Sequence, residues 1–210
     1  VSLGRYRNAG LFVLLGVLFG SSFVAIKAGL DVLPPVFFAA LRFDVAAPLL
    51  LVYAAVRYDD WIPRTRPDVL SLVVGALTII AVNNGLLFLG QRTIPPAAAS
   101  VMYGLNPILS PAFAFLLLGQ RLGVRGIVGI LLGLVGVVVI VQPSPETLTS
   151  GSTVGQLYVL AAAVVIALGS VLTRRIEATV ESIPMTAWAM GLGAVLLHAW
   201  SLAIGESAAG

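Results

Sequence analysis

The 210-residue sequence has no cysteine and only one histidine, His198. Without cysteine the chain has no disulfide framework, no thiolate metal site and no cysteine nucleophile. One histidine and nine Asp and Glu residues leave few ligands for a metal centre. No Walker sequence is present, which excludes nucleotide hydrolysis by this chain. We therefore expect neither a metal nor a cofactor.

Charge is scarce as well, since Asp, Glu, Lys and Arg make up 10% of the chain and hydrophobic residues 59%. A soluble domain is roughly 45–50% apolar. A chain of this size and composition cannot hide its apolar surface in a water-soluble core, so we expect a lipid bilayer to be its partner. The net charge of +3 then reflects Arg residues at the membrane surface, and we expect no binding of nucleic acid.

Long apolar runs are what the sequence has in abundance. A helix needs about 20 apolar residues to cross the hydrocarbon core. Backbone left unpaired in lipid is too costly, and nothing here alternates as a barrel strand does. The prediction is an all-α, polytopic membrane helix bundle with seven spans. The spans are Gly10–Leu30, Pro35–Val56, Val69–Gly90, Pro96–Leu118, Leu122–Val141, Val154–Thr173 and Pro184–Ile204.

The Lys and Arg residues between these spans are sorted by side. Nine of them share one side: Arg5, Arg7, Arg57, Arg64, Arg66, Arg121, Arg125, Arg174 and Arg175. Only Lys27 and Arg92 lie on the other side, and Arg42 lies inside a span. Short cytoplasmic loops carry the excess of Lys and Arg. We therefore predict a multi-pass protein of the cell membrane with a cytoplasmic N-terminus.

Two parts of the chain share a short pattern. Gly20-Ser21 and Pro35 recur 149 residues later as Gly169-Ser170 and Pro184. Five spans separate the copies, and because five is odd the second copy enters the membrane inverted. Inverted repeats are a common plan of secondary transporters. We predict a first repeat over 1–142, a linker rich in Pro, Ser, Thr and Gly over 143–153, and a partial second repeat over 154–210.

The stretch from Asn83 to Gln142 carries a resemblance to a known family. It contains a small-residue-rich span with Asn-Pro and Ser-Pro steps, a Leu-rich end with Gly-Gln-Arg-Leu, and a Gly-rich fifth span. Upstream, FGSSFVAIKAGL and PPVFFAALRF resemble the first span and the start of the second. Together these segments resemble an EamA-type repeat of the drug/metabolite transporter superfamily.

The resemblance implies a ten-helix secondary carrier of small metabolites, such as amino acids or drugs, with alternating access between two inverted five-helix repeats. The chain departs from the pattern in two ways. Gln120 stands where the family usually has an acid, so an ion pair made there is lost. Three of the ten helices are absent, so the second repeat is expected to be C-terminally incomplete.

Three ionisable residues lie within or near the apolar spans. Arg42 and Asp44 are inside the second span, where an ionisable group costs at least about 2.5 kcal/mol and usually faces protein or water. Residues two apart point to different sides of a helix, so each needs its own partner. Arg42 is a candidate for binding an anionic substrate group, or it ties two helices together. Asp44 is a candidate for proton coupling, whereas Lys27 is expected to anchor the first span at the interface.

Polar residues of the third and fourth spans are further candidates for substrate binding. Asn83 and Asn84 lie near one end of the third span, and Asn106 precedes Pro107 in the fourth. Because proline cannot donate a backbone hydrogen bond, a carbonyl near Tyr103 is left free. Carriers place substrate contacts at such broken helices. The alternative is that these Asn side chains only hold helices together.

His198 is either a second proton-coupling candidate or a packed, hydrogen-bonded histidine. The candidates fall at one depth of the membrane, between the outer face and the midplane, which predicts a polar cavity that opens outward. They are Arg42, Asp44, Asn83, Asn84, Tyr103, Asn106 and His198. The fifth span has a Gly129-xxx-Gly133 step that favours close helix packing, either within the chain or in a homodimer.

Other functions fit the sequence less well. No metal site, nucleophile or pair of acids supports a membrane enzyme, so we do not expect an enzyme. A retinal-type photoreceptor needs a Lys in the last helix, and Pro184–Ile204 has none. A truncated membrane protein that folds without transporting is the remaining alternative.

Overall fold

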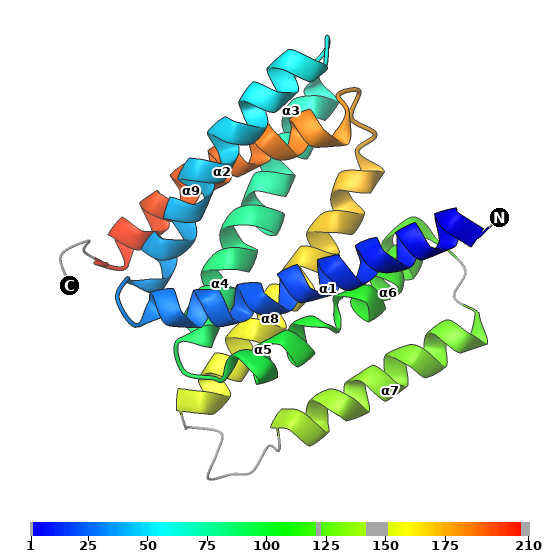
Figure 1. The fold of residues 1–210 in the computed structure, drawn as a ribbon, viewed down its shortest axis with the longest axis vertical. Coiled ribbons are helices and arrows are strands. Elements are labelled where there is room, and N and C mark those ends of the chain that lie inside the picture. Colours follow the sequence, from blue (N-terminus) through cyan, green and yellow to red (C-terminus); the bar gives the residue numbers. More distant parts are fainter. Residues whose placement is uncertain (1, 121–122, 142–150, 207–210) are drawn as a thin grey trace.

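The computed structural model describes residues 2–120, 123–141 and 151–206, and the regular structure in this part of the chain is all helical. The helices are α1 (Ser2–Leu30), α2 (Pro35–Arg57), α3 (Arg66–Val74), η1 (Gly75–Val82), α4 (Asn83–Gln91), α5 (Pro96–Tyr103), α6 (Asn106–Leu118), α7 (Val124–Val141), α8 (Gly151–Arg175) and α9 (Ser182–Ala203) (Figure 1). The segments α3, η1 and α4 form one continuous helical stretch, in which η1 is π-helical.

Six helical stretches of the described residues are long and apolar enough to cross a membrane. The ends of these stretches lie within about one helical turn of the ends of the predicted spans. They agree because a membrane span is recognised by its length and apolar composition, and the sequence alone gives both. The protein is therefore an all-helical membrane protein. The fifth predicted span, Leu122–Val141, starts outside the described residues. Its described part is α7, a helix of 18 residues that is not among the six, so a seventh crossing stays a prediction.

The predicted division into two repeats falls around a segment that is mostly not described. Residues 143–150 of the predicted linker lie outside the described residues. Residues 151–153 belong to the first turn of α8 instead of a linker. The repeat boundaries therefore stay a prediction.

Small residues allow the helices of the bundle to pack closely. α2 lies along α9, η1 contacts both α8 and α9, and α4 packs against α8 (Figure 1). Ala39 and Ala162 are fully buried in the core. Where α4 crosses α8, a Cβ atom on Gly90 would lie 2.6 Å from the carbonyl oxygen of Gly155. Membrane helices associate largely through van der Waals packing of this kind.

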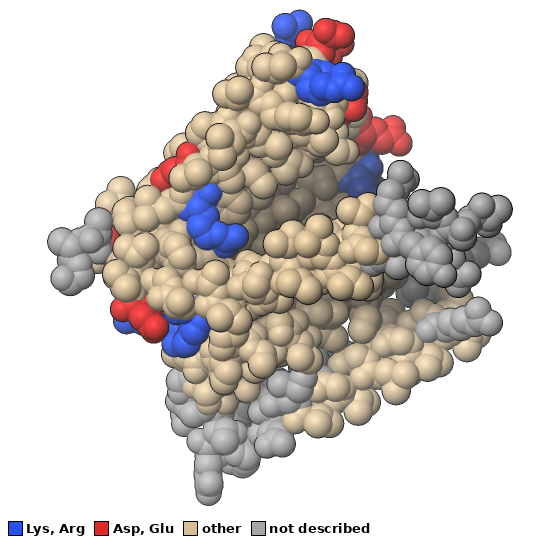
Figure 2. All heavy atoms as spheres, in the orientation of Figure 1, with Lys and Arg blue, Asp and Glu red and all other residues tan. Residues whose placement is uncertain are grey.

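The outside of the bundle is apolar. α1 packs across α4 and α5, and α7 packs against α6 at the edge of the molecule (Figure 1). Large side chains such as Phe12 on α1 and Leu116 on α6 are 78% and 69% exposed. On the face drawn in Figure 2, the Lys, Arg, Asp and Glu side chains are few and leave wide uncharged areas. Such a surface fits lipid as its solvent.

The two ends of the bundle are held by different contacts. At one end, called here the Trp61 end, residues 58–65 meet residues 176–181 and the start of α9. The rings of Trp61 and Trp188 stack there with centroids 5.8 Å apart, and the Trp188 indole N–H donates to the Trp61 carbonyl over 3.0 Å. At the other end, called the Glu206 end, lie residues 31–34 and 92–95 and the end of α9.

The N-terminus of α2 is capped by a residue from the other end of the sequence. Pro34 precedes the helix and offers no side-chain cap. The Glu206 carboxylate instead accepts the backbone N–H groups of Val36 and Phe37 over 3.2 and 2.8 Å, and the Ser201 hydroxyl over 2.9 Å. A carboxylate is favourable at the positive end of a helix dipole. Glu206 therefore ties α9 to α2 through free backbone donors.

Candidate functional site

Asp44 and His198, the two candidates for proton coupling, are brought together by the packing of α2 on α9. His198 Nε2 lies 2.8 Å from Asp44 Oδ2. The His198 side chain is 35% exposed and the Asp44 side chain is 40% exposed. The Phe37 ring meets the His198 ring edge-on, with centroids 5.7 Å apart. The pair joins residues 154 positions apart, and other described residues cover both side chains only in part.

Arg42 has a different partner, as its spacing from Asp44 predicts. The guanidinium carbon lies 5.1 Å from the centroid of the Phe88 ring on α4, and Phe88 is fully buried. A cation over an aromatic face is attracted to it. No hydrogen bond or ion pair joins the Arg42 side chain to another described residue. Its five N–H donors are therefore free to bind a ligand.

Asn83 and Tyr103 form a buried tie between α4 and α5. The Tyr103 hydroxyl donates to Asn83 Oδ1 over 3.0 Å, and Asn83 Nδ2 donates to the Ile79 carbonyl over 3.1 Å. Asn83 is 2% exposed, and the Tyr103 ring packs edge-on against Phe23 of α1. These contacts show how the two predicted residues are held, and they use half of the hydrogen-bonding capacity of the Asn83 side chain.

Asn84 is bonded through its amide nitrogen alone. Its Nδ2 donates to the carbonyls of Ile79 and Ile80 over 3.2 and 2.8 Å. Both carbonyls belong to the π-helical segment η1, a local form that is frequent at functional sites. Its Oδ1 accepts no hydrogen bond within the described residues. Asn84 lies one helical turn before Phe88 on α4, whose ring the Arg42 guanidinium contacts, and its Oδ1 remains a free acceptor.

Asn106 stands apart from the other candidates. The fourth span breaks at Gly104 and Leu105, and α6 begins at Asn106. Pro107 is then the second residue of a helix, where no N–H is required. Asn106 Oδ1 accepts the Ser110 hydroxyl over 3.1 Å within α6, and the Asn106 side chain makes no hydrogen bond with the other six candidates. The predicted break is present, but it does not bring Asn106 into the group.

Lys27 has a protein partner that the sequence did not reveal. Its Nζ donates to the backbone carbonyls of Gln91 and Arg92 over 2.9 and 2.8 Å. The last carbonyls of a helix have no partner within that helix, and a cation there is favourable. Lys27 therefore closes the C-terminal end of α4 and ties it to α1.

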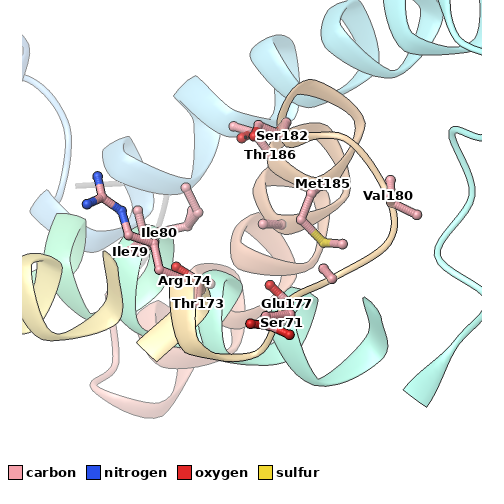
Figure 3. A pocket seen from close by; sticks show the side chains of 13 residues that line it. Ser71, Ile79, Ile80, Thr173, Arg174, Glu177, Val180, Ser182, Met185 and Thr186 are labelled. Atoms are coloured by element: carbon pink, nitrogen blue, oxygen red, sulfur yellow. Dashed lines mark hydrogen bonds between the residues drawn. The ribbon is translucent and has the colours of Figure 1, made fainter. Parts of the chain in front are cut away.

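A cavity of about 360 Å³ lies at the Trp61 end between α3, η1, α8 and α9 (Figure 3). Ser71 and Thr173 line it from α3 and α8, and Met185 lines it from α9. At its deep side it reaches Ile79 and Ile80, whose carbonyls bind the two Asn amides. The sequence gave no sign of this cavity, because its walls come from two regions that are distant in the chain, residues 71–80 and 173–189.

A buried carboxylate, Asp68, holds the loop beside this cavity. Asp68 is 1% exposed and accepts the backbone N–H groups of Thr179 and Val180 over 2.7 and 3.2 Å. It also accepts the Thr179 hydroxyl and, with the Thr65 side chain, completes the cap of α3. The loop 176–181 is thereby fixed to α3, and Val180 lines the cavity. Sequence reasoning placed Asp68 in a loop and missed it.

Comparison with known proteins agrees with the arrangement of long apolar helices. The sequence model of the EamA-like transporter family matches residues 8–142. The chain is 32% identical over 197 residues to the uncharacterized transporter YvbV of Bacillus subtilis, which covers 93% of this chain and 63% of YvbV.

Two further relatives are similar. The uncharacterized inner membrane transporter YedA of Escherichia coli K12 is 28% identical over 198 residues, covering 94% of this chain and 62% of YedA. The chloroplastic WAT1-related protein At3g02690 of Arabidopsis thaliana is 29% identical over 186 residues, covering 87% of this chain and 44% of that protein. The chain thus spans less than two thirds of these relatives. No solved structure gives a significant match.

Proposed function

Since the chain belongs to the EamA-like transporter family, we propose that it is a secondary carrier of small polar metabolites, such as amino acids or drugs. The observation that carries this proposal is Arg42, a cation within an apolar span whose N–H donors have no partner among the described residues. A charge in a membrane span is costly and is usually functional. A guanidinium is well suited to an anionic group such as a carboxylate.

The proposed substrate contacts lie around Arg42. Asn84 supplies a free carbonyl oxygen on α4, and the tie between Asn83 and Tyr103 holds this part of α4 and α5 in place. The proposal also includes Asn106, which begins α6 after the break in the fourth span. We assign it a substrate contact in a different conformation of the carrier. Polar groups of this kind in a mostly apolar bundle are typical of transport sites.

The Asp44–His198 pair is the proposed proton-coupling element. It joins α2 to α9, which are the second helices of the two proposed inverted repeats. A change in the protonation of this pair alters the charge across a helix contact, and that can bias a carrier between two states. The proposal includes alternating access between the repeats, although the chain spans only part of its relatives.

The proposed orientation places the N-terminus and the Trp61 end in the cytoplasm, in keeping with the excess of Arg in their loops. The cavity beside Ser71 would then open toward the cytoplasm. A homodimer is also proposed, but not through Gly133, because this glycine packs against Leu105 and Ile108 within the chain.

The test is transport by the chain in liposomes. Vesicles with entrapped pyranine are given a pH gradient and an equimolar mixture of radiolabelled L-amino acids. We expect amino-acid uptake that dissipates the gradient. Arg42→Gln should abolish uptake, and Asp44→Asn should leave uptake that no longer depends on the pH gradient.

Arg57→Gln is the matched control, because Arg57 ends α2 outside the proposed site. Wild-type flux no greater than that of empty liposomes would refute the carrier. Equal uptake by the Arg42 and Arg57 variants would remove Arg42 from the substrate site, and unchanged pH dependence in Asp44→Asn would remove the coupling pair.

A further inference from the structure

Four residues that line the cavity at the Trp61 end have side-chain polar groups without a hydrogen bond or ion pair among the described residues, namely Ser71, Arg174, Glu177 and Ser182. Ser71 is 4% exposed, so its side chain is almost wholly buried, and its hydroxyl makes no hydrogen bond with a described residue. The Glu177 carboxylate lines the same cavity and has neither a hydrogen bond nor an ion pair within the described residues. Buried polar side chains normally have a partner, so the Ser71 hydroxyl is the group that points to a ligand, whereas Arg174, Glu177 and Ser182 are exposed.

Two charged residues of opposite sign line the cavity, Arg174 and Glu177. Arg174 precedes Glu177 by three residues, and the two form no ion pair. Figure 3 shows the Arg174 guanidinium directed away from the labelled Glu177, Ser71 and Met185. The same view places Glu177 and Ser71 at one side of the cavity. This side therefore offers acceptors and a negative charge to a ligand.

The opposite walls are apolar. Ile79, Ile80 and Ala189 line the cavity together with the Met185 thioether. The volume of about 360 Å³ is at the lower end of the range for small-molecule pockets. A ligand that fits this cavity therefore carries a cationic hydrogen-bond donor at one end and a short apolar group at the other.

From these groups we infer that the cavity binds a small primary amine, with its ammonium on Glu177 and Ser71 and its apolar tail against Ile79, Ile80 and Ala189. An ammonium has three N–H donors and no acceptor, which matches a carboxylate and a hydroxyl oxygen. A free anion would meet Glu177 with like charge. A zwitterion would bring a carboxylate next to Glu177, and the Arg174 guanidinium that could bind this carboxylate is directed away.

Three compounds of nearly the same shape test this inference. Isoamylamine carries the ammonium, isoamyl alcohol replaces it with a neutral hydroxyl, and leucine adds a carboxylate. Each is titrated by saturation-transfer NMR onto the chain in phosphatidylcholine nanodiscs, and the signal of empty nanodiscs is subtracted. Phosphatidylcholine has no N–H to donate, so the lipid does not imitate the ligand. We expect saturable binding of isoamylamine, at least about tenfold tighter than that of the other two.

Glu177→Gln removes the charge without changing the size of the side chain, and it breaks no contact that the described residues make. It should weaken isoamylamine binding at least about tenfold, and Ser71→Ala should weaken it less. Glu181→Gln is the matched control, because Glu181 is in the same loop region but does not line this cavity. Equal binding by the Glu177 and Glu181 variants would overturn the inference, as would leucine or isoamyl alcohol binding as tightly as the amine.

The assay uses no membrane gradient, so it is independent of transport. If the protein binds isoamylamine but does not transport amino acids, only the proposed function is refuted. If the protein transports amino acids but shows no saturable binding of isoamylamine, only the inference about the cavity is refuted.

Discussion

The contact between α4 and α8 allows a stability prediction whose size follows from the geometry. A Cβ atom added at Gly90 would lie 2.6 Å from both the Gly155 carbonyl oxygen and Val159 Cγ2. The carbonyl belongs to the backbone, so a side-chain rotation cannot remove the clash. Gly90→Ala therefore forces the two helices apart by roughly 0.5–1 Å, which forfeits a quarter to a half of the dispersion energy of each affected atom pair.

Overpacking of this kind costs about 1–3 kcal/mol, and contact with rigid backbone favours the upper part of that range. The substitution also removes a glycine from a helix, which returns up to about 1 kcal/mol. We expect Gly90→Ala to lose about 2 kcal/mol of unfolding free energy in total. At about 2–4 °C per kcal/mol for a chain of this size, the melting temperature should fall by several degrees.

Gly16→Ala is the matched control, because nothing lies within 4 Å of a Cβ at Gly16 on α1. It should keep or slightly raise the melting temperature. Both variants are heated in detergent micelles and followed by circular dichroism at the helix band. If Gly90→Ala melts at or above the wild-type temperature, the close crossing of α4 and α8 is wrong.

Three other contacts give predictions of their own. A double-mutant cycle of Asp44→Asn and His198→Gln is measured by thermal unfolding. It should give a coupling energy of only about 0.5–1 kcal/mol, because both side chains are more than a third exposed. A coupling energy of zero would mean that the pair does not form. Lys27→Met should cost about 1–2 kcal/mol in the same assay, because two carbonyls at the end of α4 lose their donor, and Lys27→Arg should restore part of it. Asp68→Asn should speed tryptic cleavage after Arg175, because the loop that follows loses the carboxylate that binds it; an unchanged cleavage rate would show that the loop is held by other contacts.

The positions of the helices could be predicted because crossing a bilayer imposes a length, and apolar composition over that length is visible in the sequence. The break in the fourth span was also visible, since Pro107 cannot continue a helix begun at Pro96 in the usual way. Both signals are local. They need no knowledge of which helices are neighbours.

Partners could not be predicted in this way. Arg42 and Asp44 were expected to have separate partners from their spacing on a helix, but the spacing does not say that these are Phe88 and His198. The contact of Lys27 with backbone carbonyls leaves no trace in the sequence, because any residue can supply a carbonyl. The same holds for Asp68, whose donors are mostly backbone N–H groups.

Three polar side chains at the helix ends differ from two within the spans in how their bonding capacity is used. At the helix ends, Asp68, Glu206 and Lys27 are bonded to free backbone groups, which is what stability requires of a terminus. Within the spans, Arg42 and Asn84 retain donors or acceptors that no described residue satisfies. Unused polar groups in an apolar setting lower stability and persist only where another selection acts. We therefore expect substitution of the end groups to change melting with little effect on substrate specificity, and substitution of Arg42 or Asn84 to change transport while melting is kept or improved.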